Sequence, residues 1–141
     1  MKIKIKYHSD IIPLEQKRNS DWIDLRAAED VEMKGGEFKL IPLGVSMKLP
    51  DGYEALVIPR SSTFKNWGLL QTNHCGLIDN SYCGDDDVWY FPALATRDVT
   101  VEKNSRICQF RIQRSMDGIE FETVDKLLDI NRKGFGSTGR V

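Results

Sequence analysis

Apolar and polar residues alternate with a period of two along much of the chain. Residues 2–7 alternate lysine with isoleucine and tyrosine, and residues 45–49 repeat the pattern before a Pro-Asp-Gly turn. Successive side chains of a β-strand point to opposite faces, so this period predicts half-buried strands. Shorter β-rich runs between turn-forming residues predict further strands at 53–59, 87–94, 98–102, 106–112 and 119–124.

The helical pattern is nearly absent. No segment has an apolar stripe longer than about two helical turns. Residues 64–70 are expected to hold one short turn of helix, which Gly68 would end. Many short strands in a single domain spanning residues 1–141 predict an all-β fold, either a sandwich or a barrel such as a jelly roll.

Composition narrows the classes of function. The 20 basic and 21 acidic residues leave a net charge of −1, which lacks the basic excess typical of proteins that bind nucleic acid. The chain has no continuous apolar stretch of membrane-spanning length, and its first residues alternate where a signal peptide is apolar. Three cysteines without a paired spacing favour reduced thiols and a cytoplasmic location.

Residues Arg60, Ser61 and Ser62 follow Pro59 at the end of a predicted strand. The guanidinium group of arginine is a planar set of donors that suits phosphate oxygens, and two hydroxyls add further donors. The alternative is an exposed loop with a local serine turn.

The segment GLIDNSYCGDDD at residues 76–87 contains a second group of polar candidate residues. Asp79 comes directly after Leu77 and Ile78, and Tyr82 follows the turn formers. This pattern predicts either a carboxylate held at the mouth of a β-hairpin with Tyr82 as a wall, or a hairpin whose aspartate merely caps its own turn.

Two further polar residues lie among apolar neighbours. Asp24 stands between Ile23 and Leu25, so its charge requires a cation or hydrogen-bond donors. Gln109 lies in an apolar strand, where its amide must bond either a ligand or the backbone of a neighbouring strand.

The run NRKGFGSTGRV at 131–141 combines glycines, hydroxyls, cations and one aromatic residue. Such a segment is either a frayed terminus or a phosphate cradle, because glycine allows backbone N–H groups to turn toward an anion.

In this order, the motifs closely resemble the five motifs of the homotrimeric deoxyuridine triphosphatase (dUTPase) family. They are DLRA at 24–27, PRSS at 59–62, GLID with a following Tyr and Gly-Asp at 76–85, RICQ at 106–109 and GFGSTG at 134–139. The resemblance implies a β-jelly roll that hydrolyses dUTP to dUMP and pyrophosphate with Mg²⁺. It also implies a homotrimer with sites at the subunit interfaces and a mobile C-terminal lid at 131–141.

The resemblance also implies a role for individual residues. Asp79 would activate the water that attacks the α-phosphate, and Asp24 would contact Mg²⁺ through water. The nucleoside would be bound by Asn73, Gly76, Leu77, Ile78, Tyr82 and Phe135. The phosphates would be bound by Arg60, Ser61, Ser62, Gln109, Arg132, Gly136, Ser137 and Thr138.

The chain departs from the family pattern in its tail, and two other functions are open. The family places an arginine five residues before the phenylalanine, where this chain has Ile130, so Arg132 is expected to take that place. A dCTP deaminase of the same fold would need a glutamate on the strand after the hairpin, but no glutamate lies between Asp79 and Glu102. A non-catalytic nucleotide-sensing regulator is the other alternative.

Overall fold

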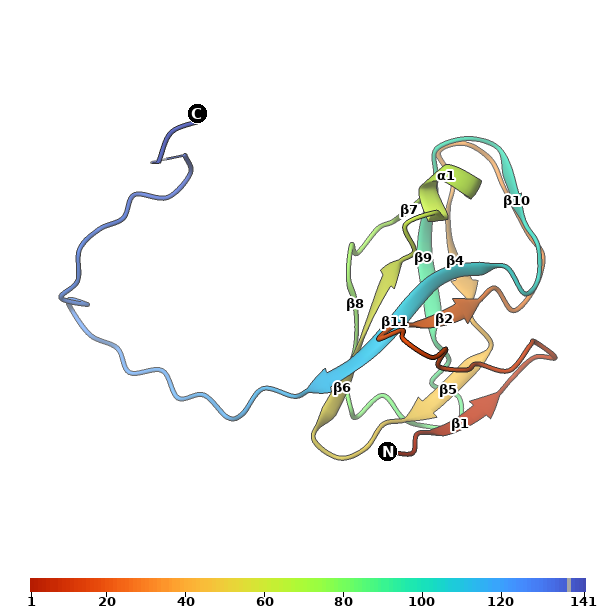
Figure 1. Ribbon diagram of the computed structural model, residues 1–141, viewed down its shortest axis with the longest axis horizontal. Coiled ribbons are helices and arrows are strands. Elements are labelled where there is room, and N and C mark those ends of the chain that lie inside the picture. Colours follow the sequence, from red (N-terminus) through yellow and green to blue (C-terminus); the bar gives the residue numbers. More distant parts are fainter. Residues whose placement is uncertain (137) are drawn as a thin grey trace.

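The computed structural model describes residues 1–136 and 138–141, and its body consists of β-strands with one short helix (Figure 1). The strands confirm the predicted all-β class. In chain order the elements are β1 (Lys4–Tyr7), β2 (Ile23–Arg26), β3 (Val31–Met33), β4 (Phe38–Pro42), β5 (Val45–Lys48), β6 (Tyr53–Pro59), α1 (Thr63–Trp67), β7 (Leu69–Gln71), β8 (Gly76–Ile78), β9 (Tyr90–Ala95), β10 (Val99–Val101) and β11 (Arg106–Arg114).

The strands form antiparallel sheets around one core. The largest sheet has the order β2-β11-β6-β8, and a second has the order β4-β9-β7. Two-stranded pairs, β1-β5 and β10-β3, complete the body. The core between them is apolar, and within it Trp89 packs edge-on against Phe110 with ring centroids 5.3 Å apart.

Side chains alternate between the two faces of the β4-β9-β7 sheet, of which only β9 was predicted as a strand. Ile41, Phe91 and Leu69 point into the core, whereas Phe38 and Leu40 lie on the opposite face and are about half exposed. β1 forms within the predicted range but is not half-buried: all four of its residues are exposed, Ile5 at 38%, because it lies in a two-stranded sheet with β5. The short helix predicted before Gly68 is confirmed as α1, and Gly68 ends it with a positive φ of 64°.

One predicted strand is absent, and another starts later than predicted. Residues 119–124 form no strand, because the chain leaves the body after β11 and finds no neighbouring strand to pair with (Figure 1). Residues 87–89 lie outside β9, which starts at Tyr90. The segment after β8 is likewise a turn and a loop rather than the returning strand of a β-hairpin, since β8 pairs with β6 instead.

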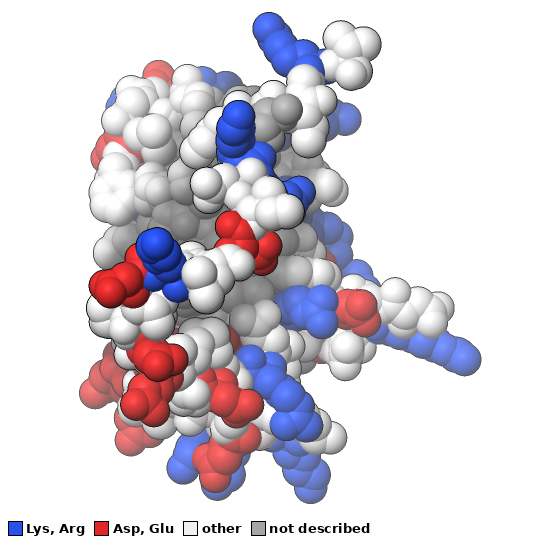
Figure 2. Space-filling view, turned by 90° about the vertical axis from the view of Figure 1, so that its left-hand side faces the viewer, with Lys and Arg blue, Asp and Glu red and all other residues white. Residues whose placement is uncertain are grey.

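The surface carries both signs of charge. Figure 2 shows Lys and Arg side chains beside Asp and Glu side chains on one face of the molecule, in keeping with the nearly equal totals. Within the described residues, no helix has the length and apolar character needed to cross a membrane.

Candidate functional site

Asp24 is held by two arginines, and we call these three side chains the arginine cluster. Arg60 Nε lies 3.0 Å from Asp24 Oδ1, and Arg106 Nη1 lies 3.0 Å from Asp24 Oδ2. The Asp24 side chain is only 24% exposed, so its charge is partly removed from water. The two guanidinium groups supply the cations that the sequence position of Asp24 required.

The loop from Arg60 to Thr63 is fixed by a buried hydroxyl. Thr63 Oγ1 donates to the carbonyl of Ile107 at 2.7 Å and accepts the backbone N–H of Arg60 at 2.8 Å. Arg60 Nη1 also donates to the carbonyl of Arg106. Ser61 is exposed and Ser62 half-buried in this same loop, so the three predicted phosphate ligands stand together.

Gln109 lies beside the arginine cluster. It pairs with Asp24 on β2 and with Ile58 on β6, and its Nε2 donates to the carbonyl of Pro59 at 3.2 Å. Of the two partners considered from the sequence, the backbone of a neighbouring strand is the one observed. An amide nitrogen carries two hydrogens, so this bond uses only one of them.

Asp79 lies in an exposed turn, and we call residues 76–82 the Asp79 segment. The hydroxyl of Ser81 donates to Asp79 Oδ2 at 3.0 Å, and the backbone N–H of Tyr82 donates to the Asp79 carbonyl. Asn80 Nδ2 donates to the carbonyls of Pro50 and Tyr53, which ties the turn to the start of β6. The carboxylate is therefore oriented and open to solvent.

Tyr82 stands on the same segment with its ring partly exposed. Its hydroxyl donates to the carbonyl of Val88 at 2.9 Å. Partial burial, with the nearby charges of Asp87 and Tyr90, raises the pKa of Tyr82 above its usual value. The phenol is thus neutral at physiological pH and its hydroxyl remains a donor.

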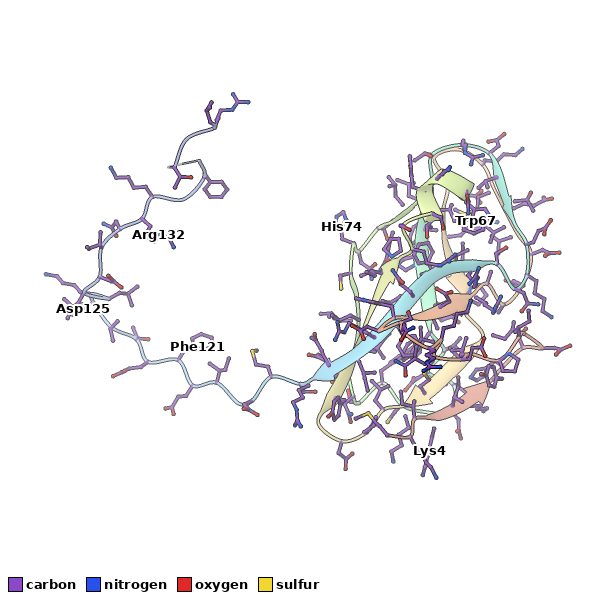
Figure 3. All side chains as sticks on the ribbon, viewed as in Figure 1. Lys4, Trp67, His74, Phe121, Asp125 and Arg132 are labelled. Carbon is purple, nitrogen blue, oxygen red and sulfur yellow. The ribbon has the colours of Figure 1, made fainter. Side chains whose placement is uncertain are left out.

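Asn73 lies in the tight turn between β7 and β8, next to His74 at the edge of the body (Figure 3). Its Oδ1 accepts a hydrogen bond from Gln71 Nε2 at 2.8 Å. The predicted nucleoside ligands from Asn73 to Tyr82 follow one another along β8 and its flanking turns, where Gly76 is buried and Ile78 is half-buried.

Asp79 and the arginine cluster lie at opposite ends of β6. Ile78 pairs with Ala55, so Asp79 lies beside the start of β6, whereas Arg60 follows its end. With about 3.3 Å per residue, the six residues from 54 to 60 separate the groups by about 20 Å. A single chain does not bring Asp79 to the arginine cluster.

The tail residues form a third group. Residues 116–136 and 138–141 extend away from the body, and Phe121, Asp125 and Arg132 lie far from it (Figure 3). Phe135 is fully exposed, and the predicted ligands Arg132, Gly136 and Thr138 lie on the same extended segment. Ser137 lies outside the described residues.

Asp24 is the predicted metal contact. Among the described residues, no group of three His, Cys, Asp or Glu side chains lies close enough to hold a metal ion. A carboxylate has about four lone-pair sites, so Asp24 can bond both arginines and still accept from a metal-bound water. The residues therefore fit an ion held largely by water and phosphate, which is the usual manner of Mg²⁺.

Sequence reasoning did not single out Arg106 and Thr63 as functional residues. Arg106 is the first residue of the RICQ motif, and its place in the same motif as Gln109 was the feature of the sequence that could have indicated a role. Thr63 gave none, because a threonine after two serines does not reveal that its hydroxyl reaches a carbonyl on β11.

A family model described as dUTPase matches residues 9–139. The SPβ prophage-derived deoxyuridine 5'-triphosphate nucleotidohydrolase YosS of Bacillus subtilis (strain 168) is 56% identical over 140 residues, covering 99% of each chain.

Two solved structures share the fold. A variant of the Staphylococcus bacteriophage 80alpha dUTPase with dUpNHpp has a TM-score of 0.82 at 20% identity and covers 99% of each chain. A dUTPase variant from phage phi11 of S. aureus, described with a structural Mg(II) ion, has a TM-score of 0.76 at 16% identity. It covers 90% of this chain and 99% of that one.

The family model and the Bacillus relative place the protein in the class of hydrolases that act on a nucleoside triphosphate. The chain belongs to the dUTPase family. It is a dUTP diphosphatase, and the resemblance stated from the five motifs is confirmed. The family uses Mg²⁺.

Proposed function

We propose that the chain converts dUTP to dUMP and pyrophosphate by attack of water on the α-phosphate, with Asp79 as the base that activates the water. The orientation of Asp79 carries this proposal. Within residues 1–136 and 138–141, only the Ser81 side chain donates to its carboxylate, and it uses Oδ2. Oδ1 can then accept a proton from water, as general base catalysis requires.

The nucleoside binds on the Asp79 segment. The backbone of Gly76, Leu77 and Ile78 reads the uracil edge together with the Asn73 amide. The exposed ring of Tyr82 packs against the deoxyribose, where it leaves no room for a 2′-hydroxyl. The bond from Tyr82 to the Val88 carbonyl supports this role, because it holds the ring in one position.

The triphosphate binds to Arg60, Ser61, Ser62 and Gln109. Arg60 keeps further guanidinium donors besides the Nε that pairs with Asp24 and the Nη1 that bonds the Arg106 carbonyl. Gln109 likewise has a second amide hydrogen to offer. Phosphoryl transfer needs mainly positioning and neutralisation of charge, which these donors supply.

Asp24 is the residue that would hold Mg²⁺, through a bridging water molecule. The ion would supply positive charge that offsets the negative charge of the phosphates. Asp24 would accept a hydrogen bond from a metal-bound water, and the ion pairs with Arg60 and Arg106 hold its carboxylate in one orientation.

The active enzyme is a homotrimer of jelly-roll subunits with sites between chains. The separation of Asp79 from the arginine cluster supports this assembly, since one site needs both. A second support is the apolar outer face of the β4-β9-β7 sheet, which exposes Phe38, Leu40, Leu70 and Tyr90. Exposed apolar patches of this kind mark surfaces that another chain covers.

The tail of one chain closes over a site on another. Phe135 stacks on the uracil ring, while Arg132, Gly136, Ser137 and Thr138 surround the terminal phosphates. The exposed apolar tail residues Ile119, Phe121, Leu127, Leu128 and Ile130 support docking on a neighbour, because the chain's own body leaves them in water. In the cytoplasm, this reaction removes dUTP and supplies dUMP for thymidylate synthesis.

Pyrophosphate release from dUTP, dCTP, dTTP and UTP tests the proposal. We expect release from dUTP alone at low substrate concentration, and a trimer by light scattering. Formation of uracil nucleotides from dCTP would support the deaminase, and nucleotide binding without turnover would support a regulator. A fully active monomer would contradict the proposed assembly.

A further inference from the structure

Gln71 is a buried polar residue beside the Asp79 segment, and both of its amide hydrogens are used. It is 5% exposed at the end of β7. Its Nε2 donates to the Val57 carbonyl at 2.9 Å and to Asn73 Oδ1 at 2.8 Å. Its Oε1 is buried without a partner among the described residues. Burying an amide oxygen without a hydrogen-bond partner costs free energy. A glutamine at this position therefore suggests that its two N–H donors have a role.

The two bonds fix the orientation of Asn73. The Val57 carbonyl can only accept, so the Gln71 atom that faces it must be the donor Nε2. The Asn73 atom that faces the same Nε2 must then be the acceptor Oδ1. The backbone of β6 therefore fixes the orientation of the Gln71 amide, and Gln71 in turn fixes the orientation of the Asn73 amide.

The local backbone makes room for this arrangement. Val57 pairs with Gly76, and a Cβ at Gly76 would lie 3.3 Å from Val57 Cβ and 3.5 Å from Gln71 Nε2. His74 adopts a positive φ of 58°, and its N–H donates to the Gln71 carbonyl. The tight turn thus holds Asn73 directly above the Gln71 amide.

We propose that Gln71 is a positioning residue that selects uracil against cytosine by turning the Nδ2 donor of Asn73 toward the base. Uracil presents carbonyl acceptors, whereas cytosine carries an exocyclic amino group that donates. An Asn73 locked with its Oδ1 turned back to Gln71 matches the first base and opposes the second. The inference rests on the proposed role of Asn73 in binding the nucleoside.

A double-mutant cycle between Gln71 and Asn73 tests the relay. Gln71→Met keeps the length of the side chain but removes both donors, which frees Asn73 to rotate. We expect the KM for dUTP to rise about tenfold with kcat within about twofold, and the dUTP-to-dCTP ratio of kcat/KM to fall about tenfold. In the Asn73→Ala background the same change should have no further effect on either quantity.

Several outcomes separate the inference from the proposed function. If Gln71→Met changes KM and the dUTP-to-dCTP ratio equally in the parental and the Asn73→Ala backgrounds, Gln71 has only a structural role. Asn73→Ala with parental dUTP kinetics would show that Asn73 does not contact the base. That result would overturn both the relay from Gln71 and the proposed role of Asn73 in nucleoside binding. An effect of Asn73→Ala with none of Gln71→Met would overturn the relay alone. Gln113→Met is the matched control, since Gln113 pairs with Glu54 on the surface, and it should leave both KM and the ratio unchanged.

A second variant covers the case in which Gln71→Met fails to fold. Asn73→Asp keeps an acceptor toward Gln71 but replaces the outward donor with another acceptor. We expect this variant to fold and to lose its preference for dUTP over dCTP. A parental preference in Asn73→Asp would overturn the inference.

Discussion

Asp24 and Arg60 meet across β11, with Arg60 Nε 3.0 Å from Asp24 Oδ1, although β2, which carries Asp24, does not pair with β6, which ends just before Arg60. Arg106, on β11 itself, bonds the second oxygen of the same carboxylate. A single carboxylate therefore orients two cations from two different motifs, and the position of Arg60 depends on Asp24.

Asp24→Asn should weaken both folding and catalysis, because it leaves two partly buried guanidinium groups without their counter-charge. We expect the free energy of unfolding to fall by roughly 1–3 kcal/mol and kcat/KM for dUTP to fall about 100-fold. Urea titration and steady-state kinetics measure the two effects. Asp98→Asn is the control, since its pair with Lys34 at 3.7 Å is exposed and should contribute about 0–1 kcal/mol. Equal effects of the two substitutions would contradict the role given to Asp24.

Asp79→Asn should keep dUTP binding near its parental strength and lower kcat by at least about 100-fold, because the geometry survives while the base is lost. Calorimetry with a non-hydrolysable analogue measures the binding affinity, and single-turnover kinetics measure the rate of the chemical step. Asp86→Asn, in the exposed acidic run nearby, is the matched control. Turnover of Asp79→Asn within tenfold of the parent would exclude Asp79 as the base.

Tyr82→Ala should relax discrimination between sugars. Removing the ring opens space for a 2′-hydroxyl, so hydrolysis of UTP should rise relative to that of dUTP. Tyr82→Phe keeps the ring and loses only the hydrogen bond to Val88, so it should keep most of the discrimination. If Tyr82→Ala leaves the ratio of UTP to dUTP hydrolysis unchanged, the ring does not contact the sugar.

Two inactive variants should restore each other in mixed trimers. Chains with Asp79→Asn and chains cut before Gly134 are refolded together. With random mixing and cyclic symmetry, about three-quarters of trimers are mixed and each has one intact site in three, so activity should recover to roughly a quarter of the parent. Each variant refolded alone is the control. Exchanged trimers without recovered activity would mean that each tail closes over its own subunit.

The three cysteines should react unequally with an alkylating reagent. Cys75 and Cys83 are exposed, whereas Cys108 is buried on β11. Burial raises the pKa of the Cys108 thiol, and the nearby Asp24 charge raises it further, so the reactive thiolate is disfavoured. Mass spectrometry of the native protein should find two modified cysteines, and urea should release the third. Rapid labelling of Cys108 in the native protein would contradict this packing.

The order of residues by itself determined the all-β class, the short helix ended by Gly68 and the set of candidate site residues. These features depend on local chemistry: alternation that suits a pleated strand, glycine that tolerates a positive φ, and donors grouped in short motifs. The same local view produced the strand at 119–124, whose apolar residues follow a strand pattern but have no partner strand among residues 1–136 and 138–141.

Only the tertiary structure decided which of these residues meet. The pairing of β11 with both β2 and β6 brings Asp24, Arg60 and Arg106 together, and the pairing of β8 with β6 carries Asp79 to the far end of the same sheet. The bond between Gln71 and Asn73 likewise depends on where the Val57 carbonyl points. Strand register is set by long-range burial of one face, and no short motif encodes it.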